Sequence, residues 1–175
     1  WESELGPWLK QGGRLLLTGP SPRVGSGSLL EGLGLVEPGT QVEQEHPSSP
    51  DVAAECYLCV RPGHALARQF PYLIPCGFWR IRPHGAETPA DMLCVLHERT
   101  EGKQFIAQRS GPPGPNAGCP GWCSWRVGAG RITYLPFDLF AAYWNTGDGQ
   151  LLDIAAAAID DLARDLLPYR IEEEA

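Results

Sequence analysis

A short helix leads directly into an apolar strand near the start of the sequence, and this order limits the folds open to the chain. The stretch SELGPWLKQGG (3–13) has one apolar helical face and ends in two glycines, which are typical of a helix stop. The run RLLLT (14–18) is apolar at three successive positions, which predicts a strand covered on both faces. We therefore expect an α/β fold with this strand in the centre of a sheet.

The rest of the sequence predicts further strands and connecting loops. Apolar or alternating runs indicate strands at 54–60, 77–83, 91–98 and 104–109. The Pro/Gly-rich run 110–121 indicates a loop. This order favours a mixed sheet with helices packed on it.

A hairpin and a long helix are predicted near the end of the chain. WCSWRV (122–127) and RITYLP (131–136) are joined by Gly-Ala-Gly, which is typical of a tight β-hairpin. The run GQLLDIAAAAIDDLARDLL (149–167) predicts a helix that Pro168 ends. Its expected apolar stripe consists of Leu151, Ala155, Ala158, Leu162 and Leu166. Its expected solvent-facing charges are Asp153, Asp160, Asp161 and Arg164.

The charge and the length exclude some classes of partner. The formal net charge of −7 argues against nucleic acid or an anionic membrane surface as the main partner. No apolar run approaches the roughly 20 residues that cross a bilayer. A chain of 175 residues is expected to form one domain.

The six cysteines favour free thiols. Cys56 and Cys59 form a C-x-x-C, but they lie in a strand-like run, where residues three apart point to opposite faces. Cys119 and Cys123 lie in a Pro/Gly-rich stretch and could instead form a bridge or bind a metal. Because free cysteine commonly behaves as a small buried hydrophobe, we expect no metal site. Free thiols also indicate a reducing compartment, so we expect a cytoplasmic protein.

Three stretches resemble one known group of domains. They are WLKQGGRLLLTGPS (8–21), GHALARQFPY (63–72) and WRVGAGRITYLPFDLFAAYWNTGDGQLL (125–152). Together they resemble the class I glutamine-amidotransferase-like domain of some glycoside hydrolases, in particular the β-galactosidase trimerisation domain of glycoside hydrolase family 42 and its relatives. The resemblance implies a three-layer, flavodoxin-like sheet, mixed with an antiparallel hairpin in its second half.

The resemblance also implies how the parent protein is organised. Residues 1–168 would form the amidotransferase-like domain, truncated at its N-terminal side, and residues 169–175 would begin a following segment. A catalytic (β/α)8 barrel would lie upstream in the parent chain. The parent would be a homo-oligomer, by analogy a trimer, and would act in carbohydrate metabolism.

The residues that carry the amidotransferase reaction are missing at the matching positions. That reaction needs a cysteine on the turn after a buried strand, activated by a His-x-Glu at the end of a later strand. The turn here holds Gly19, Pro20 and Ser21, and the later strand end holds residues 135–137 followed by Asp138. No phosphate-binding loop or H-E-x-x-H motif is present either. We therefore expect no catalytic residue and no cofactor in this domain.

Five residues are candidates for a ligand site or a subunit contact: Ser21, Trp125, Asp138, Tyr143 and Trp144. Ser21 follows the strand and could face a substrate. Asp138 could cap the next helix, with Tyr143 and Trp144 packing that helix or meeting a partner. Alternatively, these three could line a sugar-binding cleft. Trp125 lies near a strand end, and large aromatic side chains are enriched at interfaces.

Two functions follow from these observations. The first is a non-catalytic structural and oligomerisation domain of a larger, β-galactosidase-like glycoside hydrolase. The alternative is an amidotransferase-like domain that binds a small molecule, such as a sugar, or hydrolyses one independently. A barrel encoded upstream of Trp1 would favour the first function, and a short chain without a barrel would favour the second.

Overall fold

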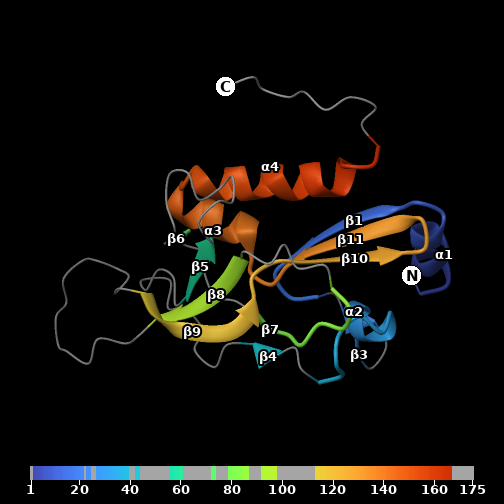
Figure 1. Ribbon diagram of the computed structural model, residues 1–175, viewed down its shortest axis with the longest axis horizontal. Helices are drawn as coiled ribbons and strands as arrows, with labels where there is room; N and C mark the ends of the chain where they lie inside the picture. The colour runs from blue at the N-terminus through green and yellow to red at the C-terminus, as the bar shows by residue number, and fades with distance from the viewer. Residues whose placement is uncertain are drawn as a thin grey trace.

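The computed structural model describes residues 2–21, 23–24, 27–39, 42–43, 56–60, 72–73, 79–86, 92–97 and 113–166 (Figure 1). The strand expected at 104–109 and the segment 169–175 lie outside these residues. In chain order, the elements are α1 (Glu2–Lys10), β1 (Arg14–Thr18), β2 (Arg23–Val24), β3 (Gly27–Ser28), α2 (Leu29–Gly32), β4 (Val42–Glu43), β5 (Cys56–Val60), β6 (Tyr72–Leu73), β7 (Trp79–Arg80), β8 (Met92–His97), β9 (Pro113–Pro120), β10 (Cys123–Val127), β11 (Gly130–Leu135), α3 (Leu139–Thr146) and α4 (Gln150–Ala163).

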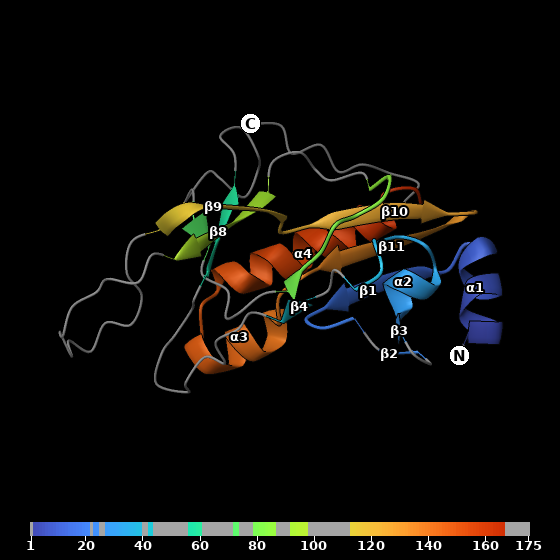
Figure 2. The same cartoon turned by 90° about the horizontal axis from the view of Figure 1, so that it is seen from below.

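A mixed sheet of three strands, in the order β1-β11-β10, carries the helices. β1 runs parallel to β11, with Arg14 opposite Arg131 and Thr18 opposite Leu135. β10 runs antiparallel to β11, so the expected hairpin is confirmed. α4 lies along one side of this sheet, whereas α2 lies on the other side and α1 lies at the end with the hairpin turn (Figures 1 and 2). The α/β class is therefore confirmed.

The central strand of this sheet is β11, and the expectation that RLLLT would be central is wrong. Among the described strands, β1 pairs only with β11, and all five of its residues are half-buried. Leu16 packs against one apolar cluster, whereas Leu15 and Leu17 pack against the other. The apolar run therefore does reflect cover on both faces. It does not encode the position of the strand within the sheet.

A second, antiparallel sheet has the order β6-β5-β8-β9. Its outer strand β9 has the sequence PGPNAGCP and was expected to be a loop, which is wrong. β9 pairs with β8 through a register with shifts between Cys94 and Val95 and between Val95 and His97. Proline is tolerated on outer strands and at bulges, where a missing backbone N–H donor does not interrupt a ladder. The tertiary partner thus overrides the local composition.

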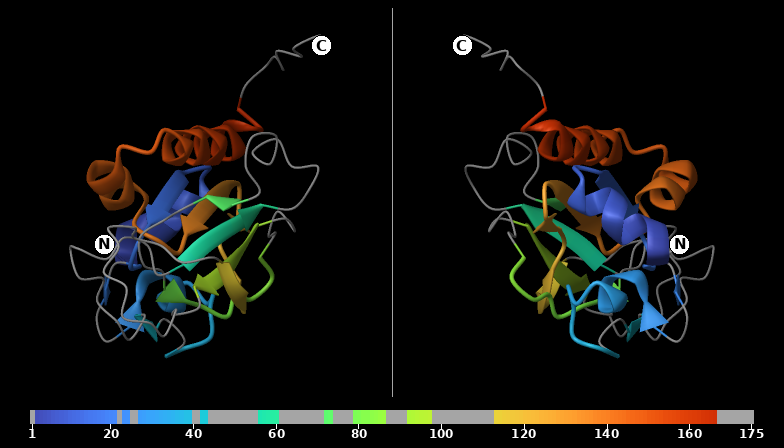
Figure 3. Two further views of the ribbon diagram at one scale, coloured as in Figure 1. Left: turned by 90° about the vertical axis from the view of Figure 1, so that its left-hand side faces the viewer. Right: turned by 90° about the vertical axis from the view of Figure 1, so that its right-hand side faces the viewer.

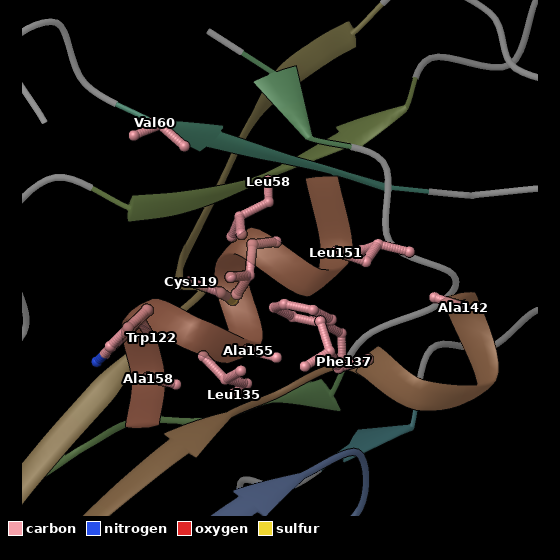
Figure 4. Close-up of a cluster of buried hydrophobic side chains, with 12 residues drawn as sticks. Leu58, Val60, Cys119, Trp122, Leu135, Phe137, Ala142, Leu151, Ala155 and Ala158 are labelled. Carbon is pink, nitrogen blue, oxygen red and sulfur yellow. The ribbon is translucent and has the colours of Figure 1, made fainter. Parts of the chain in front are cut away.

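The larger apolar cluster fills the space between the two sheets, α3 and α4 (Figure 4). Leu58 and Val60 of β5 contribute from one sheet, and Leu135 of β11 contributes from the other. The alternating burial of β5 agrees with its prediction as a strand, since Cys59 between these two residues is only half-buried. The other residues of this cluster are Cys119, Trp122, Phe137, Leu139, Ala142, Leu151, Ile154, Ala155 and Ala158.

The predicted long helix is present as α4, but its faces differ from the expectation at three positions. Asp161 is buried although it was expected in solvent, and Leu166 is exposed although it was expected in the apolar stripe. The stripe instead includes Ile154, which is fully buried. In the described part of the chain, no helix is long and apolar enough to cross a membrane.

Candidate functional site at the strand ends

The turn after β1 is the position that the sequence resemblance matches to a nucleophile turn, and it is tied to the end of β11. Gly19 adopts a φ of 73°, a left-handed conformation that glycine accepts without strain. Its N–H lies within hydrogen-bond distance of two carbonyl oxygens, those of Leu135 (3.1 Å) and Phe137 (2.8 Å). Its own carbonyl accepts a hydrogen bond from the Tyr134 hydroxyl at 2.8 Å. The backbone polar groups of this turn are therefore used within the fold.

Ser21 is buried beneath the start of α2 rather than facing solvent. Its Oγ accepts a long hydrogen bond of 3.4 Å from the Leu30 N–H. The same helix is closed by a capping box, in which Ser28 Oγ accepts from the Glu31 N–H and the Glu31 carboxylate accepts from the Ser28 N–H. The capping box closes the start of α2, and the hydrogen bond to Ser21 links that helix to the turn. Ser21 thus has a structural contact in place of the exposure that a nucleophile needs.

The end of β11 is filled by side chains of the chain itself. Leu135 and Phe137 are fully buried in the larger cluster, and the ring of Phe137 turns from the end of β11 into that cluster (Figure 4). The Pro136 carbonyl accepts a hydrogen bond from the Trp79 N–H at 2.7 Å. Asp138 is the N-cap of α3, because its Oδ1 accepts from the Ala141 N–H at 2.9 Å. This agrees with the capping interpretation of Asp138.

The aromatic candidates fall into two different environments. Tyr143 and Trp144 are exposed on α3, and Trp144 is 87% exposed. Phe140, three and four residues earlier, is also exposed on this helix. Trp125, in contrast, is buried in the smaller cluster, where its Nε1 donates to the His84 carbonyl at 2.9 Å. Trp125 is therefore a core residue of the folded chain and not a surface contact.

A buried polar cluster that the sequence analysis missed joins α4 to the hairpin. Asp161 accepts hydrogen bonds from Arg131 through both carboxylate oxygens, from Nη2 at 3.0 Å and from Nε at 3.2 Å. The hydroxyls of Ser124 (2.9 Å) and Thr133 (3.0 Å) donate to the same carboxylate. Trp122 completes the cluster by donating from Nε1 to Ser124 Oγ at 3.1 Å. We call these five residues the Asp161 cluster.

One signal in the sequence does indicate this cluster. Ser124 and Thr133 are paired opposite each other across the hairpin, and Arg131 lies two residues from Thr133 on the same face. With Arg126, which is paired opposite Arg131, four polar residues lie on one face of an otherwise apolar hairpin, and those that are buried there require a polar partner. On the helix, Asp161 stands three residues after the buried Ala158, at the edge of the buried face.

The pKa shifts of Asp161, Cys119 and Cys123 favour a structural role over acid–base chemistry. Burial alone would raise the pKa of Asp161, but the hydrogen bonds from Ser124, Arg131 and Thr133 and the charge of Arg131 together hold it below its usual value. Burial raises the pKa of Cys123 to about 12. Burial also raises the pKa of Cys119, against the opposing charges of Arg80 and Arg82.

These pKa directions limit what the thiols can do. Cys59, Cys119 and Cys123 form no disulfide, and a thiol with a raised pKa is protonated at neutral pH, which makes it a poor nucleophile and a poor metal ligand. Within the described residues, no group of three or more His, Cys, Asp or Glu side chains is arranged to hold a metal ion. The side chain of Cys56 lies outside the described part of the structure.

Comparisons with known proteins agree with the fold. No protein-family model and no curated protein matches the sequence. Among solved structures, α-L-fucosidase isoenzyme 2 from Paenibacillus thiaminolyticus matches with a TM-score of 0.61 and 15% identity, over 94% of this chain and 23% of the fucosidase. A cytoplasmic protein from Salmonella typhimurium LT2 matches with a TM-score of 0.50 and 9% identity, over 90% of this chain and 59% of that protein.

A β-galactosidase from Rahnella sp. R3 matches more weakly, with a TM-score of 0.48 and 16% identity over 98% of this chain and 21% of the enzyme. That score is too low to support a functional conclusion. The chain spans less than a quarter of the length of the two glycosidases. At these identities the matches to the fucosidase and to the Salmonella protein show a shared fold and nothing finer.

Proposed function

We propose that this chain is a non-catalytic, structural domain of a larger glycosidase. The observation that carries the proposal is that Gly19, Ser21 and Asp138 at the strand ends already have hydrogen-bond partners within the fold. The Phe137 side chain beside them is buried in the larger apolar cluster. The likeness to one region of a much longer fucosidase supports a domain within such an enzyme. The sequence resemblance narrows the proposal to a β-galactosidase-like parent with a catalytic barrel upstream.

The same proposal includes a three-layer, flavodoxin-like arrangement of the class I amidotransferase type. Its support is the parallel pair β1 and β11, the antiparallel β10 beside it, and the helices on both sides of this sheet. The outer edge of β1 is where further strands would join the sheet. A homo-oligomeric parent in the cytoplasm is also proposed, and the free thiols Cys59, Cys119 and Cys123 support a reducing compartment.

The chain is expected to turn over neither glutamine nor nitrophenyl glycosides of galactose, fucose or mannose. The physical reason is that Ser21 is buried against α2 and Asp138 is engaged as a helix cap. The measurement compares the chain with Ser21→Ala in both assays. Ser21→Ala should cost at most about 1 kcal/mol of unfolding free energy, because Leu30 loses one long hydrogen bond. Turnover that disappears in a folded Ser21→Ala variant would disprove the non-catalytic assignment.

The parent gene offers an independent check of the same proposal. A reading frame upstream of Trp1 that encodes a (β/α)8 barrel with two carboxylates at strand ends is the expected result. A frame that encodes no barrel would contradict the glycosidase assignment.

Sugar binding on α3 is a second candidate, and the exposed aromatic side chains favour it. Phe140, Tyr143 and Trp144 lie on one side of the helix, and aromatic faces can stack on the apolar face of a pyranose ring. Calorimetric titration with galactose, mannose and fucose tests this function. A saturable heat that is lost in Trp144→Ala would favour it over a purely structural role, whereas our proposal expects no such heat.

A further inference from the structure

The helix α4 carries a second apolar row besides the face that it buries in the core. Leu152, Ile159 and Leu166 are 46%, 56% and 60% exposed, and they are spaced seven residues apart, with Leu166 in the turn that continues directly from the last residue of α4, Ala163. Ala156 is exposed and Ala163 is half-buried between them, so the spacing along the row alternates between four and three residues. This is the spacing of a helix–helix seam. We call these five residues the α4 row.

Such a row is unusual on a helix of this kind. A surface helix normally has one apolar stripe, which packs on its own domain, and polar residues elsewhere. In α4 that stripe is already formed by Leu151, Ile154, Ala155, Ala158 and Leu162. The outer side of α4 has no described element over it (Figures 1 and 3). A continuous apolar row that is left exposed marks an interaction site.

The order of residues in the α4 row is nearly palindromic, and this favours a second copy of the chain as the partner that binds it. The order of residues is Leu152, Ala156, Ile159, Ala163 and Leu166. A twofold axis through Ile159 places Leu152 of one copy opposite Leu166 of the other, and Ile159 opposite itself. A self-complementary patch of this kind is the requirement of an isologous dimer. The two alanines leave room for the helices to approach closely.

The charges beside the row select the antiparallel arrangement. Asp153 and Asp160 flank the row on one side, together with Arg164, whose side chain is 60% exposed although it also pairs with Asp161. In the antiparallel arrangement, Asp153 lies near Arg164 of the second copy, twice by symmetry, against one Asp160–Asp160 approach at the axis. A parallel pair about a twofold axis along the helices would put the charges of the two copies on opposite sides of the pair, so Asp153 would gain no contact with Arg164 of the second copy.

We propose that the α4 row is a contact between two copies of this chain, with the two α4 helices antiparallel about a twofold axis at Ile159. The inference rests on the proposed structural role and specifies its surface, and it gives a dimer where the sequence resemblance implied a trimer. The row extends over about 21 Å at 1.5 Å per residue. A single helix pair of this length is smaller than a standard interface of about 800 Å² per partner, so the dimer depends on concentration.

Sedimentation of the 175-residue chain over a concentration series tests the surface. The chain is expected to dimerise at the upper concentrations, and Ile159→Asp is expected to abolish the dimer by placing two carboxylates at the axis. Phe140→Asp is the matched control, because Phe140 on α3 is also 56% exposed but lies outside the row. Circular dichroism and thermal unfolding check that both variants fold. Loss of the dimer in Phe140→Asp but not in Ile159→Asp would overturn the proposal.

Cysteine cross-linking tests the direction of the helices. With oxidised glutathione as oxidant, two thiols form one disulfide and glutathione disulfide is reduced to two thiols. Ile159→Cys is expected to give a covalent dimer by itself. Leu152→Cys and Leu166→Cys should each fail alone, because each lies about 21 Å from its own copy, and should cross-link when mixed. The unsubstituted 175-residue chain under the same conditions controls for cross-linking through the native cysteines.

The outcomes separate this proposal from the proposed function. Cross-linking of Leu152→Cys with itself would show a parallel pair and overturn the arrangement. A chain that is monomeric at all concentrations would overturn the contact altogether. Neither result affects the non-catalytic assignment, which fails only if the chain turns over a substrate.

Discussion

Gly130→Ala is expected to destabilise the chain by about 3–5 kcal/mol, because the backbone of α1 lies directly against this glycine. A Cβ at position 130 would lie 2.5 Å from the Gly13 carbonyl oxygen and would overlap the Leu9 carbonyl oxygen even more closely. Both neighbours are backbone atoms, so no side-chain rotation can relieve the overlap. The substitution must therefore move α1 away from the hairpin.

That movement also breaks the hydrogen bonds that join the two elements. The Ala129 N–H donates to the Lys10 carbonyl at 3.1 Å, and the Arg131 N–H donates to the Gly13 carbonyl at 3.0 Å. The hairpin turn thus satisfies carbonyl groups at and just beyond the C-terminal end of α1, which its own helix leaves unpaired. Urea unfolding measures the loss, and the midpoint of thermal unfolding should fall by about 10 °C.

Gly6→Ala is the matched control for this prediction. Gly6 lies within α1, and a Cβ there would have nothing within 4 Å. The substitution should change the unfolding free energy by less than about 1 kcal/mol, because the entropy gain of alanine in a helix is opposed by contact of its Cβ with the ring of Pro7. If the unfolding free energy of Gly130→Ala stayed within about 1 kcal/mol of that of the unsubstituted chain, the contact between the backbone of α1 and the hairpin would be wrong.

The elements with strong local patterns could be predicted from the sequence. The hairpin follows from two alternating runs around Gly-Ala-Gly, and α4 follows from an uninterrupted helical stripe ending at Pro168. The cap at Asp138 also follows, because aspartate before an apolar helical run is a local signal that needs no tertiary partner. In each case the information lies within a few residues.

The features that the sequence did not reveal depend on partners far along the chain. β9 is a strand only because β8 lies beside it, and its prolines and glycines gave no local indication of this. Ser21 is buried against the start of α2, where Leu30, nine residues later, donates a hydrogen bond to it. At Asp161, a helical wheel alone places the carboxylate near the edge of the apolar face, where solvent and core are equally compatible. The hairpin, 28 to 37 residues away, decides between them.

The Asp161 cluster provides the second large expected effect. Asp161→Ala should cost about 3–5 kcal/mol of unfolding free energy, because it leaves the buried Arg131 guanidinium without its carboxylate and the hydroxyls of Ser124 and Thr133 without their acceptor. The adjacent Asp160→Ala is the matched control. Asp160 is exposed on the same helix, so its removal should change the unfolding free energy by less than about 0.5 kcal/mol.

An apolar replacement of both Arg131 and Asp161 separates two contributions to this loss of stability. One is the unpaired charge of Arg131, and the other is the loss of the hydrogen bonds from Ser124 and Thr133. The double variant Arg131→Met, Asp161→Leu removes both buried charges and should recover much of the stability lost in Asp161→Ala. A double variant as unstable as the single one would show that the hydrogen bonds of Ser124 and Thr133, rather than the stranded Arg131 charge, dominate the cost.

The pH dependence of the same cluster has a definite sign. The folded-state pKa of Asp161 is lowered from its model-compound value of 3.8, so the group contributes stability that is fully present above about pH 5. This stability is lost as the pH falls through 3.8 towards the lower folded-state pKa, because the unfolded chain takes up the proton first. The Asp161→Asn variant has no titrating carboxylate at this position. The difference in unfolding free energy between the unsubstituted chain and Asp161→Asn should therefore shrink below about pH 4. Urea unfolding from pH 7 to pH 3 measures this difference, and a difference that stayed constant over the whole range would contradict a charged Asp161 in the core.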